Sequence, residues 1–166
     1  MFKKWFKKNT ESDQKLTLFA PLSGKVVALD EVPDPVFAQK MMGEGIAIEP
    51  IEGKVVSPVD GEILQVFPTK HAIGIKAENG AEILIHIGLE TVALNGQGFT
   101  DHVSGGSKVK KGDILITFDL DFIKKEAKST ITPIIITNTN DMETIENIAP
   151  DTVTAGEHPL LTVVKK

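Results

Sequence analysis

The sequence has no cysteine, which excludes disulfide bonds, thiolate-bound zinc, iron–sulfur clusters and thiol catalysis. It has no apolar run long enough to span a membrane as a helix, and no signal-peptide core near its N-terminus. It also lacks a phosphate-binding P-loop, a dinucleotide fingerprint and a GxSxG nucleophile turn. Four histidines remain as candidates for chemistry: His71, His86, His102 and His158.

The charge balance argues against a nucleic-acid partner. The 166 residues carry a formal net charge of −5, whereas a protein that binds phosphate backbones needs a basic surface. A chain of this length is expected to form one domain with a self-sufficient core. We therefore expect a cytoplasmic, monomeric protein whose partners are other proteins.

The first 16 residues differ from the rest of the chain. Phe2, Trp5 and Phe6 lie at helical spacing among lysines, a short basic amphipathic pattern that suits weak membrane contact through residues 2–8. Because so short a helix is marginal alone, a solvated tail is the favoured interpretation. We expect a flexible arm over residues 1–16 and a single folded domain over residues 17–166.

From Thr17 onward, short runs of Val, Ile, Leu and Thr alternate with turns rich in Gly, Pro, Asn and Asp. This texture predicts strands, which we place at residues 16–20, 24–29, 45–50, 53–58, 61–67, 72–77, 81–87, 114–119, 132–138 and 159–164. Short helices are indicated only at residues 34–43, 121–129 and 140–148. In the first of these, Asp34 is the expected N-cap and Gly43 the expected stop. The predicted fold is all-β, an antiparallel sandwich or barrel hybrid.

The chain also contains an internal repeat. FAPLSGKVVAL (residues 19–29) matches VSPVDGEILQV (residues 56–66), and residues 109–118 resemble residues 153–163. The copies are too few and too irregularly spaced for a solenoid. We expect two related β-units on one core, with Gly24 and Gly61 at equivalent tight turns.

A predicted hairpin brings two histidines together. The strands at residues 72–77 and 81–87 flank Asn79-Gly80, a dipeptide typical of two-residue hairpin loops. With such a loop, Ile73 faces His86, and His71 points to the same side as His86. A three-residue loop would reverse the parity and separate the rings.

Paired imidazoles suit phosphoryl transfer, metal binding or a merely structural role. A neutral imidazole is nucleophilic near pH 7, and a second ring can donate a hydrogen bond to phosphoryl oxygens. Two rings alone would leave a metal ion short of ligands. His86 lies within the apolar run ILIHIGL, where a polar ring needs a reason. Gly74 and Gly88 would leave room for another protein, whereas His102 and His158 adjoin turn residues and are expected at the surface.

The chain resembles the glucose-family enzyme IIA component of the bacterial phosphoenolpyruvate:sugar phosphotransferase system. The resemblance covers roughly residues 17–166. Its motifs are APLSGKVV, VPDPVFAQKMMGEGIAI, SPVDGEI, TKHAIGI, ILIHIGLETVALNGQGF, VKKGDILITFDL and KSTITPIIITN. It implies the same sandwich or barrel hybrid with a duplicated motif.

The resemblance also implies roles for particular residues. His86 would carry the phosphoryl group on Nε2, His71 would stabilise that group with Thr69 beside it, and the Gly88 carbonyl would fix the tautomer. Glu90 stands where the family usually has aspartate. The expected docking surface is an exposed apolar patch around the histidines, made of Pro35, Val36, Phe37, Met42, Phe67, Leu84, Glu90 and Val92.

The implied partners are two proteins. The phosphoryl donor would be the histidine-phosphorylated carrier HPr, and the acceptor a cysteine of a sugar-specific IIB domain during sugar uptake. The resemblance implies no required cofactor. Since the carrier never touches the sugar, its sequence does not encode which sugar is transported.

The resemblance also implies an alternative function, a regulatory module whose unphosphorylated form binds transporters or kinases. Zinc would then be shared between His71, His86 and a partner carboxylate. A biotinyl or lipoyl carrier is disfavoured because Lys54 and Lys70 lack the local pattern of a modified lysine.

Overall fold

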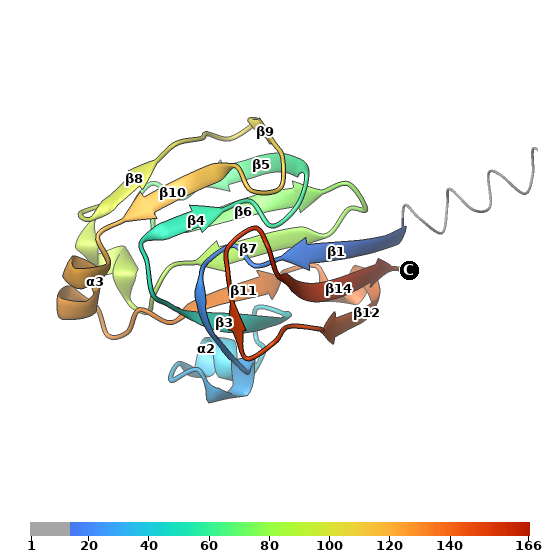
Figure 1. Ribbon diagram of the computed structural model, residues 1–166, viewed down its shortest axis with the longest axis horizontal. Helices are drawn as coiled ribbons and strands as arrows, with labels where there is room; N and C mark the ends of the chain where they lie inside the picture. Colours follow the sequence, from blue (N-terminus) through green and yellow to red (C-terminus); the bar gives the residue numbers. More distant parts are fainter. Residues whose placement is uncertain (1–13) are drawn as a thin grey trace, which may run out of the picture.

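The computed structural model describes residues 14–166, and strands dominate it (Figure 1). The strands are β1 (Lys15–Phe19), β2 (Gly24–Val27), β3 (Glu44–Pro50), β4 (Lys54–Val56), β5 (Gly61–Val66), β6 (Ala72–Ala77), β7 (Glu82–His86), β8 (Phe99–Asp101), β9 (Lys108–Val109), β10 (Ile114–Phe118), β11 (Thr132–Ile136), β12 (Met142–Asn147), β13 (Thr152–Val153) and β14 (Pro159–Lys165). The helices are α2 (Pro35–Ala38) and α3 (Leu120–Glu126), with short 3-10 turns η1 (Leu29–Glu31), η2 (Thr91–Leu94) and η3 (Thr139–Asp141). None of the described helices is long and apolar enough to cross a membrane.

The first strand begins earlier than expected. β1 includes Lys15 and Leu16, which pair with Val164 and Val163 of β14. We assigned both residues to the arm, although the strand predicted at residues 16–20 already included Leu16. The arm boundary at residue 16 is therefore wrong by two residues, because pairing with the last strand satisfies the backbone of this segment. The predicted lipid-contacting pattern at residues 2–8 lies outside the described residues.

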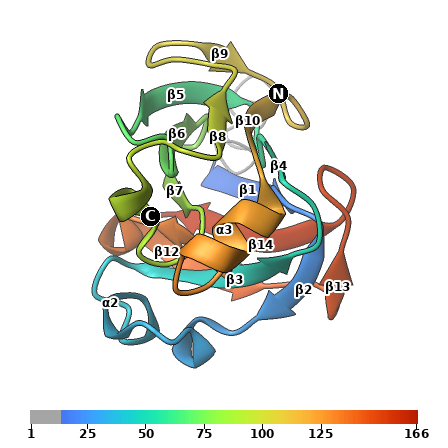
Figure 2. The ribbon, with the colours of Figure 1, turned by 90° about the vertical axis from the view of Figure 1, so that its left-hand side faces the viewer.

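The strands form three antiparallel sheets. The largest has the order β13-β2-β3-β11-β7-β6-β5-β9, and two three-stranded sheets have the orders β1-β14-β12 and β4-β10-β8. Figure 2 shows the large sheet curving from β9 at the top to β13 at the lower right. This arrangement confirms the predicted all-β sandwich or barrel hybrid.

The strand order reflects the internal repeat. The large sheet consists of two halves, β13-β2-β3-β11 and β7-β6-β5-β9, which meet at the β11–β7 pair. Each half ends in a two-residue strand, β13 or β9. The two repeat copies, residues 19–29 and 56–66, also bond each other in the same way. Phe19 N donates to Pro58 O at 2.9 Å, and the equivalent Val56 N donates to Pro21 O at 2.8 Å. The predicted duplication is therefore present in the fold.

Gly24 and Gly61 are equivalent, but close approach rather than a turn explains them. Each begins a strand, β2 and β5 respectively. A Cβ atom would lie 2.0 Å from the carbonyl oxygen of Glu49 at the first position and 2.3 Å from that of Lys76 at the second. Only glycine lets the neighbouring strand come this near.

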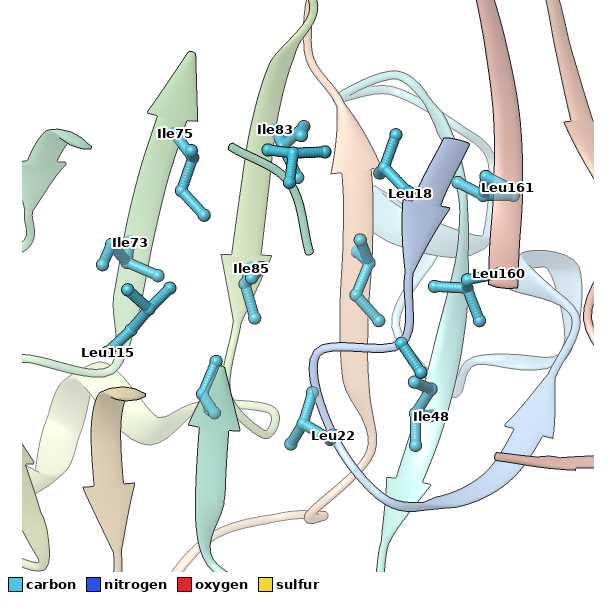
Figure 3. Close-up of a cluster of buried hydrophobic side chains, with 14 of the residues drawn as sticks. Leu18, Leu22, Ile48, Ile73, Ile75, Ile83, Ile85, Leu115, Leu160 and Leu161 are labelled. Atoms are coloured by element: carbon cyan, nitrogen blue, oxygen red, sulfur yellow. The ribbon is translucent and has the colours of Figure 1, made fainter. Parts of the chain in front are cut away.

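The large sheet separates two hydrophobic clusters. Its inner face packs against the smaller sheets through a main core that includes Leu18, Ile73, Ile85, Leu115 and Leu161 (Figure 3). Its other face carries a smaller cluster: Leu29, Val32, Phe37, Ala47, Ala72, Leu84, Leu89 and Ile135. Strand alternation sends Ile73 and Ile85 to the first cluster and Ala72 and Leu84 to the second.

The predicted helices are partly wrong. Asp34 caps α2 as expected, with Oδ1 accepting from Val36 N at 3.0 Å, but the helix ends at Ala38 rather than near Gly43. Residues 142–147 form strand β12 instead of a helix, because their backbone pairs with β14. Tertiary pairing here outweighs the local helical pattern.

Candidate functional site

The hairpin of β6 and β7 has a different register from the predicted one. Ala72, not Ile73, faces His86, and the loop contains three residues, Glu78 to Gly80. Gly80 alone takes the left-handed conformation, with φ of 94°, as in a type I turn followed by a bulge. The two-residue loop was therefore wrong.

The side chain of Asn79 explains the longer loop. It is buried, and its Oδ1 accepts from Ala81 N at 3.0 Å. Its Nδ2 donates to Gln14 O at 3.1 Å and to Val163 O at 3.4 Å. Asn79 thus ties the hairpin to the residue before β1 and to β14, and sequence alone does not reveal these distant partners.

The two histidine rings nevertheless lie side by side. Their centroids are 4.9 Å apart, at an interplanar angle of 78°. His71 precedes the first residue of β6 and follows Lys70, whose φ is 59°. Strand alternation therefore does not set the direction of the His71 side chain. The predicted ring contact is confirmed, although the register that we used to derive it is wrong.

His86 is held in one tautomer by backbone. Its Nδ1 lies 2.8 Å from the carbonyl oxygen of Gly88, and a carbonyl can only accept, so Nδ1 carries the proton and Nε2 keeps its lone pair. Burial lowers the pKa of His86, while the Gly88 hydrogen bond and the charge of Asp34 act in the opposite direction. The ring is consequently a neutral imidazole with a nucleophilic Nε2 at neutral pH.

His71 is almost inaccessible to solvent, with 5% of its surface exposed. Its Nδ1 lies 2.6 Å from Oγ1 of Thr69, and its ring meets Phe67 edge-on at a centroid distance of 5.7 Å. Burial, together with the nearby His86, lowers the pKa of His71 to about 4. The structure thus places Thr69, His71, His86 and Gly88 together, as expected.

The two flanking glycines differ from each other. A Cβ at Gly74 would only touch Leu64 at 3.7 Å, so this position stays open. Gly88 is buried with φ of 72°, and a Cβ there would lie 2.8 Å from Ser129 O and from Thr91 Cγ2. Gly88 therefore shapes the backbone. The expectation that it leaves room for a partner protein is wrong.

The residues expected to dock partners divide by exposure. Pro35, Val36, Met42, Glu90 and Val92 are exposed, and Phe67 is partly buried. Phe37 and Leu84 are only 4% and 6% exposed, so as surface residues they were predicted wrongly. They belong to the smaller hydrophobic cluster, and the ring centroids of Phe37 and His86 are 5.1 Å apart.

Met42 lies away from the histidines. It lines a hollow with Thr137, Asn138 and Thr139, next to the start of β7, whereas His86 ends that strand. A contact surface centred on the histidines would therefore not include Met42.

Asp34 was seen in the sequence only as a helix cap. The structure adds that its charge acts on His86 and raises the pKa of that ring against the effect of burial. Nothing in the spacing of Asp34 and His86 signals this, because the two residues belong to distant segments.

The described residues hold no cluster of three or more His, Cys, Asp or Glu side chains suited to a metal ion. Zinc shared between His71 and His86 would need ligands from another molecule. His102 and His158 are exposed, as predicted; they bond Thr117 Oγ1 and Thr154 N respectively, both at 2.9 Å.

Comparison with known proteins agrees with this site. The family model described as phosphoenolpyruvate-dependent sugar phosphotransferase system, EIIA 1, matches residues 16–142. The chain is 58% identical over 166 residues to a glucose-specific EIIA component of Bacillus anthracis, covering 100% of both chains. It is 53% identical over 163 residues to one of Staphylococcus epidermidis, covering 98% of both.

A solved structure supports the same assignment. Glucose permease IIA from Mycoplasma capricolum matches with a TM-score of 0.83 and 41% identity, covering 89% of this chain and 95% of that one. The family match and the near-complete coverage of these relatives leave little of the chain unaccounted for. The chain therefore belongs to the EIIA 1 family of the phosphoenolpyruvate-dependent sugar phosphotransferase system and is a phosphohistidine carrier of that system.

Proposed function

We propose that His86 accepts a phosphoryl group on Nε2 from phosphorylated HPr and passes it to a cysteine of a IIB domain. The observation that carries this assignment is the 2.8 Å contact between His86 Nδ1 and Gly88 O, which leaves the Nε2 lone pair available. Because burial lowers the pKa of the ring, the nucleophilic neutral form dominates at neutral pH.

The transfer needs little beyond positioning and electrostatics. Nε2 of His86 attacks phosphorus as the phosphorus–nitrogen bond of the donor breaks and the donor imidazole leaves. The ring of His86 then carries both the phosphoryl group and the Nδ1 proton, and the Gly88 carbonyl stabilises the resulting charge. In the onward step a cysteine thiolate attacks the same phosphorus, and His86 leaves as a neutral ring.

His71 would stabilise the phosphoryl group rather than accept it. Thr69 Oγ1 lies 2.6 Å from His71 Nδ1; when the hydroxyl donates there, the ring proton resides on Nε2. That N–H can then donate to a phosphoryl oxygen on the adjacent His86, whose ring centroid is 4.9 Å away. A dianionic phosphoryl group also favours protonation of His71, which would strengthen the bond.

Partner proteins would approach over the exposed side chains near the rings. Val36 and Val92 are 40% and 55% exposed, and Gly74 is open to contact. Apolar side chains around a partly buried nucleophile suit docking of a donor and an acceptor in turn. The proposal places the chain in the cytoplasm, and we take glucose as the first sugar to test because the relatives are named glucose-specific.

The test is a phosphotransfer assay with phosphoenolpyruvate, enzyme I, HPr and a IIB domain. H86Q should abolish acid-labile, base-stable labelling, whereas H71Q should accept label but transfer it onward at least 100-fold more slowly, at the upper end of losing a general-acid or charge-stabilising group. H158Q serves as the matched control, since His158 is exposed and lies on the β13–β14 loop. Unchanged labelling of H86Q would overturn the assignment.

A further inference from the structure

The Gly88 carbonyl is fixed by hydrogen bonds on both sides of that residue. In the Ile87–Gly88 peptide, Thr91 Oγ1 donates to the carbonyl at 2.6 Å, and the N–H donates to Thr132 Oγ1 at 3.4 Å. In the next peptide, Leu89 N donates to Ser129 O at 2.9 Å. Both peptide planes that determine where the Gly88 carbonyl points are therefore held.

The two threonines that hold the first peptide are fully buried. Thr91 and Thr132 each have 0% exposure, so water does not replace a missing hydroxyl and an unpaired peptide group would be costly. Thr132 Oγ1 donates to Thr130 O at 3.0 Å, which leaves its lone pairs facing Gly88 N. A Cβ atom added at Gly88 would lie 2.8 Å from the methyl carbon of Thr91.

We propose that Thr91 and Thr132 are positioning residues that hold the Ile87–Gly88 peptide, so that the Gly88 carbonyl keeps the proton on Nδ1 of His86 and directs the phosphoryl group to Nε2. Neither side chain is assigned a contact with the phosphoryl group. The choice of phosphorylated nitrogen rests on the proposed function of His86, but the choice of tautomer does not. A free imidazole exchanges its proton between the two nitrogens, and a fixed acceptor at one of them selects one tautomer.

The variants T91V and T132V test this arrangement. Each removes a hydroxyl while keeping the shape of the side chain, and T91S and T132S restore the hydroxyl. The matched control is T137V. Thr132 begins strand β11, and Thr137 comes directly after the end of that strand. Thr137 is exposed, and its hydroxyl donates to Glu82 O, at the end of β7 away from His86.

The primary readout is the tautomer of His86, measured by ¹⁵N NMR of the unphosphorylated protein at a pH where the ring is neutral. We expect the share of the Nε2–H tautomer to rise roughly fivefold in T91V and in T132V, the factor that one net hydrogen bond is worth. The serine variants and T137V should keep the wild-type tautomer. After phosphorylation, the valine variants should yield a correspondingly larger share of Nδ1-phosphohistidine.

The outcomes are distinguishable. An unchanged tautomer in folded T91V and T132V would overturn the positioning role, even if wild-type protein is labelled normally. Absence of labelling in wild-type protein would refute the proposed function, while the tautomer measurement would still test the two threonines. If T91V folds poorly, T132V and T132S make the same comparison at the other hydroxyl that holds this peptide, in strand β11.

Discussion

Burial keeps both imidazoles of the site uncharged at neutral pH. His71 is 5% exposed, and its pKa falls to about 4; the pKa of His86 is lowered as well. In the unfolded chain both rings would take up a proton near pH 6.5. The same burial that produces a neutral nucleophile therefore makes the fold sensitive to acid.

Stability should fall as the pH drops through this window. Between about pH 6.5 and 4 the unfolded state binds more protons than the folded state, so the contribution of His71 is complete above pH 6.5 and is lost as the pH falls. We expect His71 to account for at most about 2 kcal/mol of lost unfolding free energy between pH 7 and 5. Urea unfolding at half-unit pH steps measures this.

The variants H71Q and H102Q separate this effect from general acid sensitivity. H71Q should flatten the pH dependence, whereas H102Q, which alters an exposed ring, should leave it unchanged. If the unfolding free energy of H71Q fell with pH as steeply as that of the wild type, the proposed contribution of His71 protonation would be contradicted.

At the scale of the element, the hairpin of β6 and β7 depends on one loop side chain. Asn79 makes three hydrogen bonds, to Ala81 N, Gln14 O and Val163 O. These bonds join the loop to the residues just before β7 and β1 and to β14. The loop therefore contributes to the tertiary structure as well as to the turn.

Replacing Asn79 by alanine should destabilise the protein by about 2–3 kcal/mol, because buried backbone groups lose their partners. The neighbouring Glu78 is exposed, so E78A should change stability by less than about 0.5 kcal/mol. Urea denaturation of the two variants provides the comparison, and equal stabilities would show that the Asn79 contacts carry no net energy.

This loop also marks what sequence could and could not predict. Alternating apolar residues and turn signals located ten strands, including both strands that carry the site, since each expected range overlaps an observed strand. The register failed because Asn79 bonds atoms far away in the chain, which outweighs the usual preference of Asn-Gly for a two-residue loop. Strands β8, β9, β12 and β13 are short or polar, and pairing alone defines them.

The site also divides into residues that the sequence indicates and residues that only the tertiary structure shows. His71, His86, Thr69 and Gly88 were predicted, the last two through the family resemblance. The burial of Phe37 and the support from Thr91 and Thr132 depend on how distant strands pack, and no local pattern signals them.

At the scale of the whole molecule, the duplicated units share one structural requirement. Gly24 and Gly61 each lie against the backbone of the next strand, where a Cβ would come within 2.0 and 2.3 Å of a carbonyl oxygen. Backbone cannot move aside as a flexible side chain can, so each half of the large sheet depends on its own glycine.

We expect G24A and G61A each to destabilise the fold by about 3 kcal/mol or more, in the range of severe backbone substitutions. G74A is the matched control, because Gly74 lies in the adjacent strand β6 but its added methyl would only touch Leu64 at 3.7 Å. Thermal unfolding ranks the three variants. A loss in G74A as large as in G61A would contradict the role of close approach.

The pairing of β1 with β14 has a practical consequence for attachment. Lys15 lies opposite Val164, and Gln14 is bonded to the hairpin loop at Asn79, so the C-terminal strand end sits beside the β6–β7 turn. The histidines occupy the opposite end of that hairpin, about 20 Å away at the rise of an extended strand. A surface, dye or fused domain coupled through Lys166 would leave the face with the two histidines unobstructed, so the immobilised protein should still exchange phosphoryl groups with both proposed partners.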